Sequence, residues 1–279
     1  GGLTLLNRQP SQGADPAHLC VDRDGHWLLV ANYSSGTIAI FPVAADGSLG
    51  AAADVVQHHG SSVHPERQQA PHAHYITVDP SNRFVLVADL GMDAVLIYRL
   101  DTAQGRLVPH DPPAIAMPQG SGPRHLAWHP DGRHAYVIHE LASTLEVCSY
   151  DAQRGRLQSI QQLSTLPDGF TGTNSTAAVR VAPSGRFVYG SNRGHDSIAS
   201  FAVDGASGKL RATGHTPTQG RTPRDFNIDP AGRFLLAANQ DTDTIVVFSL
   251  DEATGALTPT GQVVEVKTPV CIAFRPPVR

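Results

Sequence analysis

One pattern recurs five times along this chain of 279 residues. Each copy has a short apolar stretch, a turn that ends in Gly or Asn, a second apolar stretch, a polar turn and a third stretch. The turn residues that mark the period are separated by 57, 50, 53 and 47 residues, and they are Gly25, Asn82, Gly132, Gly185 and Gly232. Four antiparallel strands in every 40–50 residues or so are typical of a β-propeller blade.

The turns between the apolar stretches support this interpretation. In turns of the Asp-Pro-x-Gly type, proline presets its own φ and glycine supplies a positive φ. A second turn follows the third stretch, as in AADGSL, DGASGKL and DEATGAL, and a fourth, outer strand follows that turn. The sequence therefore predicts an all-β fold with five complete four-stranded blades.

The two ends of the chain predict two further, partial blades. Residues 1–9 (GGLTLLNRQ) resemble a fourth strand without its blade, and residues 269–277 (PVCIAFRPP) resemble a first strand. We expect an absent N-terminal segment to complete these blades and give a seven-bladed β-propeller. Residues 1–279 would then belong to a single domain. The alternative is a closed propeller with fewer blades, in which the first and last strands share one incomplete blade.

The composition excludes several classes of protein. Hydrophobic residues make up 41% and charged residues 16% of the chain, so a folded core is expected. A net charge of −4 argues against a nucleic-acid partner, which requires a basic face. Cys20, Cys148 and Cys271 lack metal or disulfide spacing, which favours a reducing, cytoplasmic compartment. No apolar run approaches the roughly 20 residues of a membrane helix, and no signal peptide is visible.

Aligning the blades with one another separates scaffold from candidate site. The first strand starts and the second strand ends at the same end of a blade, near the propeller axis. The unusual residues at these positions should therefore converge on one mouth of the central channel, and they are His74, Arg124, Glu140, Arg193, Arg224 and Gln240. Arg124, which opens the strand in GPRHLAWHP, is expected to project into a polar, water-filled cavity. Repeated arginines at the opposite turns are expected to be scaffold, namely Arg83, Arg133, Arg186 and Arg233.

The residue types at this mouth suggest a chemistry. Three arginines can hold an anion, because a guanidinium binds carboxylate or phosphate through two hydrogen bonds. His74 and Glu140 are the evident acid and base. We therefore assign catalysis to His74, Glu140, Arg124 and Arg193. The residues assigned to substrate binding are His72, His125, Asn192, Arg224 and Gln240. Neither a metal nor an organic cofactor is expected, and the oligomeric state is left open.

Several of these residues also have a structural interpretation. His72 and His74 have a spacing that can bind a metal, although no third ligand is evident. His125 and His139 can fill hydrogen-bonding positions between blades, and Glu140 can pair with Arg124 or Arg193. Asp225 is expected to orient Arg224. The long connections at residues 58–74 and 167–176 are candidates for lids over the mouth.

With these residues identified, the whole chain resembles the lactonase family of seven-bladed propellers. The resemblance rests on ANYSSGTIAIFPVAADGSLG, PHAHYITVDPSNRFVLVADLGMDAVLIY, GPRHLAWHPDGRHAYVIHELAST, SNRGHDSIASF and PRDFNIDPAGRFLLAANQDTD. The family includes propeller-type 6-phosphogluconolactonases and carboxy-muconate lactonizing enzymes. The resemblance implies seven blades and, for the lactonizing branch, a site whose histidine, two arginines and glutamate match His74, Arg124, Arg193 and Glu140. Ala178 stands where the family commonly has Glu.

Three functions follow as hypotheses. The first is hydrolysis of an anionic sugar lactone, most specifically 6-phosphogluconolactone, with arginines binding the anion and His74 or Glu140 activating water. The second is lactonization of a muconate-type dicarboxylate at the same residues. The third is a non-catalytic propeller that presents its surface to a protein partner. The cluster of histidine, arginine and glutamate at one mouth favours the two enzymatic hypotheses.

Overall fold

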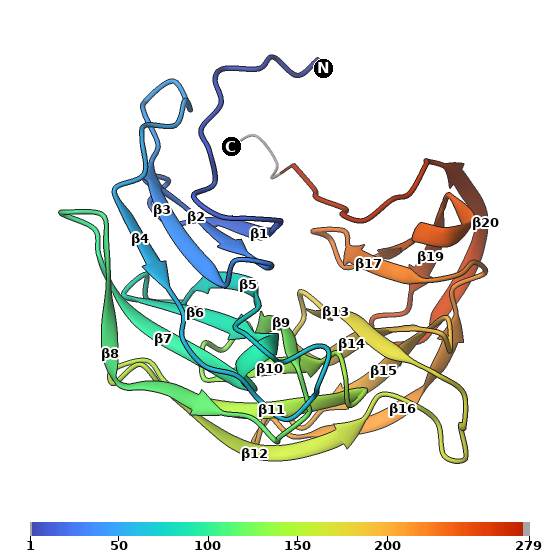
Figure 1. The fold of residues 1–279 in the computed structure, drawn as a ribbon. Helices are drawn as coiled ribbons and strands as arrows, with labels where there is room; N and C mark the ends of the chain where they lie inside the picture. The colour runs from blue at the N-terminus through green and yellow to red at the C-terminus, as the bar shows by residue number, and fades with distance from the viewer. Residues whose placement is uncertain (1, 276–279) are drawn as a thin grey trace. The chain divides into compact units, whose positions relative to one another are not determined.

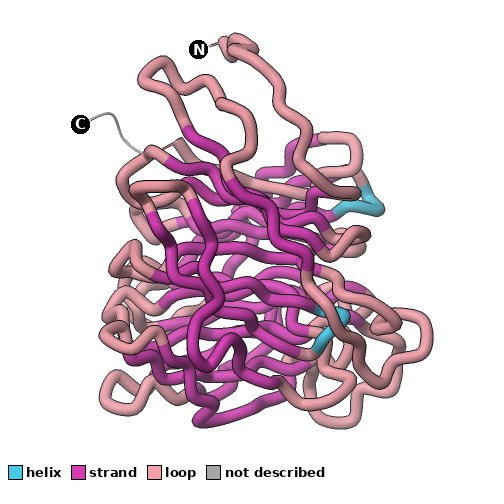
Figure 2. The backbone as a smooth tube through the Cα atoms, turned by 60° about the vertical axis from the view of Figure 1, so that its left-hand side comes forward, coloured by secondary structure: helices cyan, strands magenta, loops and turns pink. Residues whose placement is uncertain are grey.

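The structure, a computed structural model, describes residues 2–275. It contains five four-stranded antiparallel sheets, and in each sheet the strands lie in sequence order (Figure 1). Strands and loops account for nearly all of the described chain, and the exceptions are the 3₁₀ turns η1 (Leu90–Met92) and η2 (Gln240–Thr242) (Figure 2). The predicted all-β class is confirmed. The five sheets correspond to the five copies of the sequence repeat, and the total number of blades stays a prediction.

The chain divides into two compact units, one of residues 2–124 with 151–157 and the other of residues 125–150 with 158–275. The first unit contains two complete sheets: β1 (Pro16–Val21), β2 (Trp27–Asn32), β3 (Thr37–Pro42) and β4 (Asp54–Gln57), then β5 (Ala73–Val78), β6 (Phe84–Asp89), β7 (Ala94–Asp101) and β8 (Arg106–Ala116). That all 279 residues form a single domain stays a prediction.

The second unit contains two complete sheets and most of the middle sheet. The middle sheet consists of β9 (Pro123–Trp128), β10 (His134–His139), β11 (Thr144–Asp151) and β12 (Arg156–Ser164). The other two are β13 (Ser175–Val181), β14 (Phe187–Arg193), β15 (Ser197–Val203) and β16 (Leu210–Pro217), then β17 (Pro223–Ile228), β18 (Phe234–Asn239), β19 (Thr244–Leu250) and β20 (Leu257–Glu265).

Apolar side chains fill the space between successive sheets within each unit. In the first unit one core joins β2 and β3 to β5–β8, and Leu29 and Val87 are among its fully buried members. In the second unit, Tyr136 and Phe201 belong to a core shared by the middle sheet and β13–β16. Phe248 belongs to another, shared by β13–β16 and β17–β20. Both faces of inner strands such as β6 and β10 are therefore buried, which explains their apolar sequences, whereas β1 is largely exposed.

The turn between the first and second strands has a recurring local structure. Its period-marking residues all have positive φ, from 58° to 78°, namely Gly25, Asn82, Gly132, Gly185 and Gly232. In three sheets an Asp carboxylate closes this turn by accepting two backbone N–H bonds. Asp22 Oδ1, for example, accepts from His26 at 2.7 Å and from Trp27 at 2.8 Å. The arginines expected to be scaffold follow this turn, and the Arg186 guanidinium donates to the Ala253 carbonyl and lies over the Phe187 ring.

The strands predicted at the two ends of the chain are not formed. Residues 2–9 and 269–275 lie outside the strands, while residues 1, 276 and 277 of those predictions fall outside the described range. A strand requires a hydrogen-bonded neighbour, and among residues 2–275 all five sheets are already completed by four consecutive strands. The sequence pattern of these stretches is therefore not sufficient for strand formation.

The core between β13–β16 and β17–β20 gives a stability prediction. Phe248 is completely buried, whereas Phe234 is 37% exposed. Phe248→Ala should lower the free energy of unfolding by about 3–5 kcal/mol because it leaves a cavity. Phe234→Ala is the matched control and should cost much less. Urea unfolding monitored by circular dichroism would measure both, and equal losses would contradict the proposed position of the core.

The turn carboxylates give a prediction about pH. Burial alone would raise the pKa of Asp22, but hydrogen bonds from Asn82, Trp27, His26 and Asp24 outweigh it and hold the pKa below its ordinary value of 3.8. The stabilisation is therefore complete above that value and is lost as the pH falls through the lowered one. Asp22→Asn should cost about 1–2 kcal/mol at neutral pH and progressively less in acid. A cost that does not change with pH would refute this account.

Candidate active site

The first strands β5 and β17 each contain a β-bulge near their start, at the strand-entry position that the blade alignment selected. In β5 the register moves from Ala73 opposite Asp89 to Tyr75 opposite Ala88, which leaves His74 as the extra residue. Arg224 is the extra residue of β17 in the same way. Arg124 has the corresponding sequence position in β9, after Pro123. A bulge turns its side chain out of the regular alternation, and bulges are common beside active sites.

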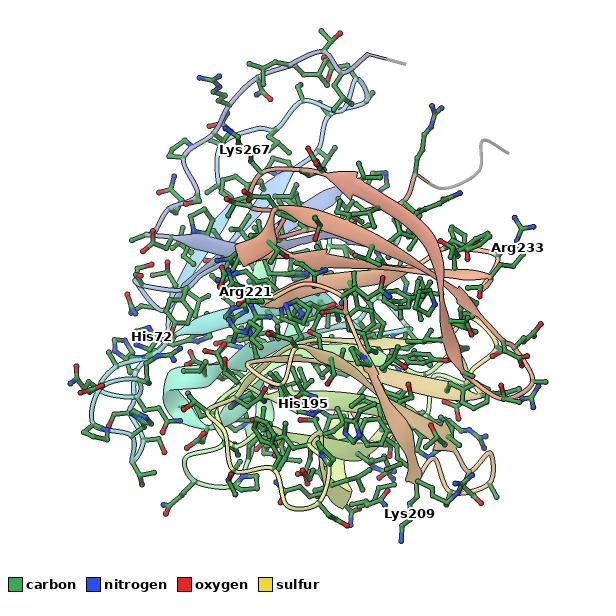
Figure 3. All side chains as sticks on the ribbon, turned by 90° about the vertical axis from the view of Figure 1, so that its right-hand side faces the viewer. His72, His195, Lys209, Arg221, Arg233 and Lys267 are labelled. Carbon is green, nitrogen blue, oxygen red and sulfur yellow. The ribbon has the colours of Figure 1, made fainter. Side chains whose placement is uncertain are left out.

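In the first unit, His74 lies in an aromatic cluster with His72 and Tyr33. The Tyr33 ring stacks on His72, with ring centroids 4.5 Å apart, and meets the His74 ring edge-on at 5.6 Å. His72 Nδ1 is 3.0 Å from the Tyr33 carbonyl, and His72, which is labelled in Figure 3, lies in the loop before β5. His74 is only 7% exposed. The two imidazoles predicted from the sequence are therefore brought together, and Tyr33 lies against both.

The connection at residues 58–74 contributes a residue that the sequence analysis missed. Arg67 Nη2 donates to the Tyr33 hydroxyl at 3.1 Å, which brings a cation to the same cluster. The connection is itself held in place, because the buried Gln68 donates to the Leu90 carbonyl at 2.8 Å. The one sequence signal for Arg67 was its place in this unusually long connection.

A buried hydrogen bond between His58 and Asp89 supports this cluster. His58 Nδ1 lies 2.7 Å from Asp89 Oδ2, and both side chains are fully buried. The other carboxylate oxygen of Asp89 accepts the backbone N–H of His72 at 2.7 Å and that of Gly91 at 3.1 Å. Asp89 is the last residue of β6, so the sheet fixes the backbone from which His72 projects.

Arg124 is buried, whereas the sequence analysis predicted that its side chain projects into a water-filled cavity. It is 2% exposed, and the adjacent His125 is 8% exposed. A guanidinium keeps its charge under all ordinary conditions and is buried only where partners compensate for lost water. The sequence indicates where Arg124 lies along the strand, but the side-chain packing that excludes water depends on other elements.

In the second unit the site is organised by Glu140 and Arg193. Glu140 follows β10 and Arg193 ends β14, and the two side chains form an ion pair with 3.1 Å between Arg193 Nη2 and Glu140 Oε2. Their exposed fractions are 12% for Arg193 and 7% for Glu140. Arg193 Nη2 also donates to the Thr176 carbonyl at 2.7 Å, and the Thr176 N–H donates to the Glu140 carbonyl at 3.2 Å. Of the two partners considered for Glu140, Arg193 is therefore one.

Asn192, one residue before Arg193, is completely buried, and both ends of its amide bind protein groups. Its Nδ2 donates to the Thr165 carbonyl at 2.7 Å, and its Oδ1 accepts from the Thr165 hydroxyl at 2.8 Å and from Asn174 at 3.2 Å. The bond from Asn174 attaches the connection at 167–176 to the end of β14. The structure thus gives Asn192 a positioning role, and its contact with substrate stays a prediction.

His139 is also buried at the end of a second strand, and its Nδ1 lies 3.0 Å from the Thr144 hydroxyl. Thr144 begins β11 of the same sheet, so a hydrogen bond of this imidazole between blades stays a prediction. Gln240 begins η2 and is partly exposed, with its Nε2 3.3 Å from Asp241 Oδ1. Arg224 is also partly exposed.

Asp225 does not have the partner that was expected. Its Oδ1 pairs with Arg180 at 2.9 Å, and its Oδ2 accepts the N–H of Ile272 at 2.8 Å. Asp225 therefore serves the sheet and the segment around Ile272.

The comparisons agree with this architecture. Residues 1–274 match the family described as "Lactonase, 7-bladed beta-propeller", and the chain belongs to this family. A 6-phosphogluconolactonase of Bacillus subtilis is 41% identical over 229 residues, which is 82% of this chain and 64% of that protein. The chain thus spans a little under two thirds of that relative.

Solved structures are similar as well. The structure of a periplasmic gluconolactonase of Pseudomonas aeruginosa has a TM-score of 0.88 and 38% identity, and the match covers 94% of this chain and 73% of that one. A crystal structure from Bacteroides fragilis, described as a candidate 6-phosphogluconolactonase, has a TM-score of 0.91 and 36% identity over 97% of this chain and 76% of that one. Neither of the two helical turns in residues 2–275 is long and apolar enough to span a membrane.

The buried ion pair of Glu140 and Arg193 gives a stability prediction that distinguishes it from ion pairs on the surface. Arg193→Ala would leave the Glu140 carboxylate buried without this partner and should cost about 3–5 kcal/mol of stability. Arg154→Ala is the matched control, because Arg154 is 70% exposed where it pairs with Asp151. It should cost no more than about 1 kcal/mol. Thermal and urea unfolding would measure both losses, and similar values would show that Glu140 gains little from Arg193.

Proposed function

We propose that this protein hydrolyses an anionic sugar lactone, and specifically converts 6-phosphogluconolactone to 6-phosphogluconate. The observation that carries the proposal is the buried Glu140–Arg193 pair at the ends of β10 and β14. It holds a guanidinium in a fixed place at a strand end. The names of the similar proteins, 6-phosphogluconolactonase and gluconolactonase, support a lactone as the substrate.

The reaction requires positive charge and a base. Water attacks the lactone carbonyl, the ring C–O bond breaks, and the ring oxygen leaves with a proton while the carbonyl becomes a carboxylate. The carbonyl oxygen is negative in the intermediate, and a fixed guanidinium in a water-poor place stabilises it. We assign this part to Arg124 and Arg193. The partly exposed Arg224 is assigned to the phosphate, which guanidinium binds well.

Two residues were candidates for the base, and the contacts favour His74. The carboxylate of Glu140 is stabilised as an anion by Arg193 at 3.1 Å, so it is suited to orienting that guanidinium. Histidine is the side chain that most often transfers protons as a general acid or base. Tyr33 flanks the His74 ring and limits its rotation. His74 is therefore assigned as the base and Glu140 as a positioning residue.

The test is an assay that couples lactone opening to 6-phosphogluconate dehydrogenase, with the spontaneous rate subtracted. His74→Asn should lower kcat by about 10²–10⁴-fold with little change in KM, because it removes the base. The melting temperature should stay close to that of the parent. The control is His26→Asn, which changes an exposed turn histidine and should leave the rate unchanged.

A second variant tests the division of roles. Glu140→Gln preserves the shape of the side chain and removes its charge, so it should raise KM more than it lowers kcat. If Glu140→Gln lowers kcat more than His74→Asn does, Glu140 is the base instead. A well-folded protein without activity on this lactone would overturn the substrate assignment. Turnover of unphosphorylated gluconolactone or of a muconate-type lactone would then identify the class. The expected cytoplasmic location stays a prediction.

A further inference from the structure

One of the five turns between first and second strands differs from the others at two positions. The turn of the middle sheet, residues 129–134, begins with His129 and ends with His134. The corresponding first positions are Asp22, Asp79, Ala182 and Asp229, and the corresponding last positions are the aromatic residues Trp27, Phe84, Phe187 and Phe234. Since the other four turns fold without either histidine, the backbone of the turn does not require them.

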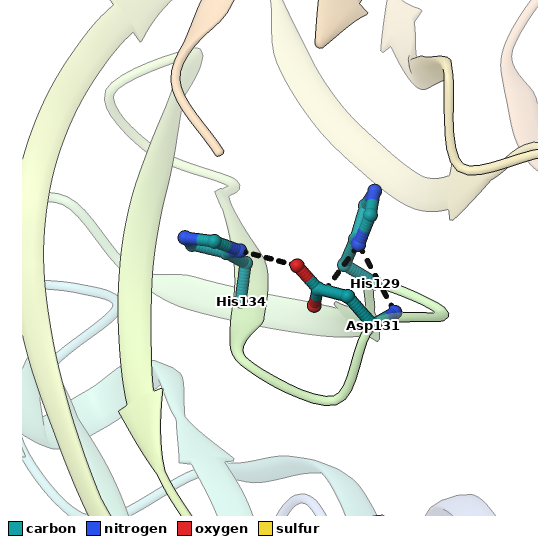
Figure 4. Close-up of side chains that lie close together, drawn as sticks. All are labelled: His129, Asp131 and His134. Carbon is teal, nitrogen blue, oxygen red and sulfur yellow. Dashed lines mark hydrogen bonds and ion pairs between the residues drawn. The ribbon is translucent and has the colours of Figure 1, made fainter. Parts of the chain in front are cut away.

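The two histidines flank a carboxylate in the same turn. His129 Nδ1 lies 3.0 Å from Asp131 Oδ1, and His134 Nδ1 lies 2.8 Å from Asp131 Oδ2 (Figure 4). One ligand atom from each of the three residues falls within 4.8 Å of the others. Their side chains are only 10–18% exposed. Two imidazole nitrogens and a carboxylate oxygen at this spacing are a typical donor set for zinc and similar ions.

The contact of the other ring nitrogen of His129 is also typical of a metal-binding histidine. His129 Nε2 lies 2.8 Å from the Gly185 carbonyl, which can only accept, so Nε2 carries the proton. Nδ1 faces Asp131 and also lies 3.2 Å from the Asp131 N–H. A metal ion bound by Nδ1 and by the carboxylate oxygen 3.0 Å away would link the two side chains. Histidine ligands of metals usually donate their other N–H to a backbone carbonyl in this way.

We propose that His129, Asp131 and His134 form a binding site for a divalent transition-metal ion of the zinc type. Three protein ligands would leave a fourth position for water. Calcium and magnesium are excluded by chemistry, since these ions prefer oxygen ligands and two of the three donors are imidazoles. Because a metal ion competes with protons for imidazole nitrogens, its affinity should fall as the pH decreases.

The site is separate from the candidate active site and has a structural role. His134 begins β10 and Glu140 follows its end, so the two lie about 20 Å apart at roughly 3.3 Å per residue. The histidines also contact the neighbouring sheet, His129 through the Gly185 carbonyl and His134 through close packing against Gly208. A bound ion would therefore fix the turn of the middle sheet against two turns of the sheet β13–β16.

The experiment titrates EDTA-treated protein with zinc chloride, and isothermal calorimetry measures the binding. A parallel titration with cobalt chloride is monitored by visible absorption. We expect one equivalent to bind in the micromolar range or tighter, with cobalt bands that report nitrogen ligands, and a higher melting temperature with zinc.

The decisive variant is the double substitution His129→Asp with His134→Phe, which installs the residues of the other turns and should fold normally. It should lose this equivalent, with affinity at least about 100-fold weaker, and zinc should no longer raise its melting temperature. His26→Asn, in the corresponding turn of the first sheet, is the control and should bind like the parent. The proposal is overturned if the parent binds no equivalent, or if the double variant binds zinc as tightly as the parent.

Discussion

The burial of one sheet against the next is the constraint on which the rest of this structure depends. Fully buried residues such as Leu29, Tyr136 and Phe248 lie in cores shared by two successive sheets, and the cluster within the first sheet alone is small. Apolar side chains fill both faces of the inner strands, and polar side chains are left to the strand ends and the turns. The candidate functional residues lie at strand ends for this reason.

The repeat made most of the fold predictable from the sequence. Gly25, Asn82 and Gly232 mark turns whose positive φ restricts the residue type, so their spacing locates the strands on either side. The strands expected at residues 1–9 and 269–277 had the right pattern, but pairing partners decide whether a stretch becomes a strand. Local pattern identifies a candidate strand, whereas the sheet that contains it depends on residues elsewhere in the chain.

The candidate site was predictable in position and less so in contacts. The alignment of blades selected His74 and Arg193 because strand ends are fixed by the repeat. It did not predict that Arg124 would be buried or that Asp225 would pair with Arg180, since both depend on side-chain packing between distant segments. Arg67 was missed for a related reason: it reaches Tyr33 from an irregular connection, and no repeat defines its position.

The recurring bulge has a consequence for how such a chain can diverge. At this position the sheets carry Ala17, His74 and Arg224, which differ completely in size and charge, while the ladder on either side is the same. An extra residue lies outside the cross-strand pairing, so its replacement does not disturb the hydrogen bonds of the strand. Mutation can therefore exchange one functional group for another at this place, and a duplicated gene can acquire a new specificity while its scaffold is inherited intact.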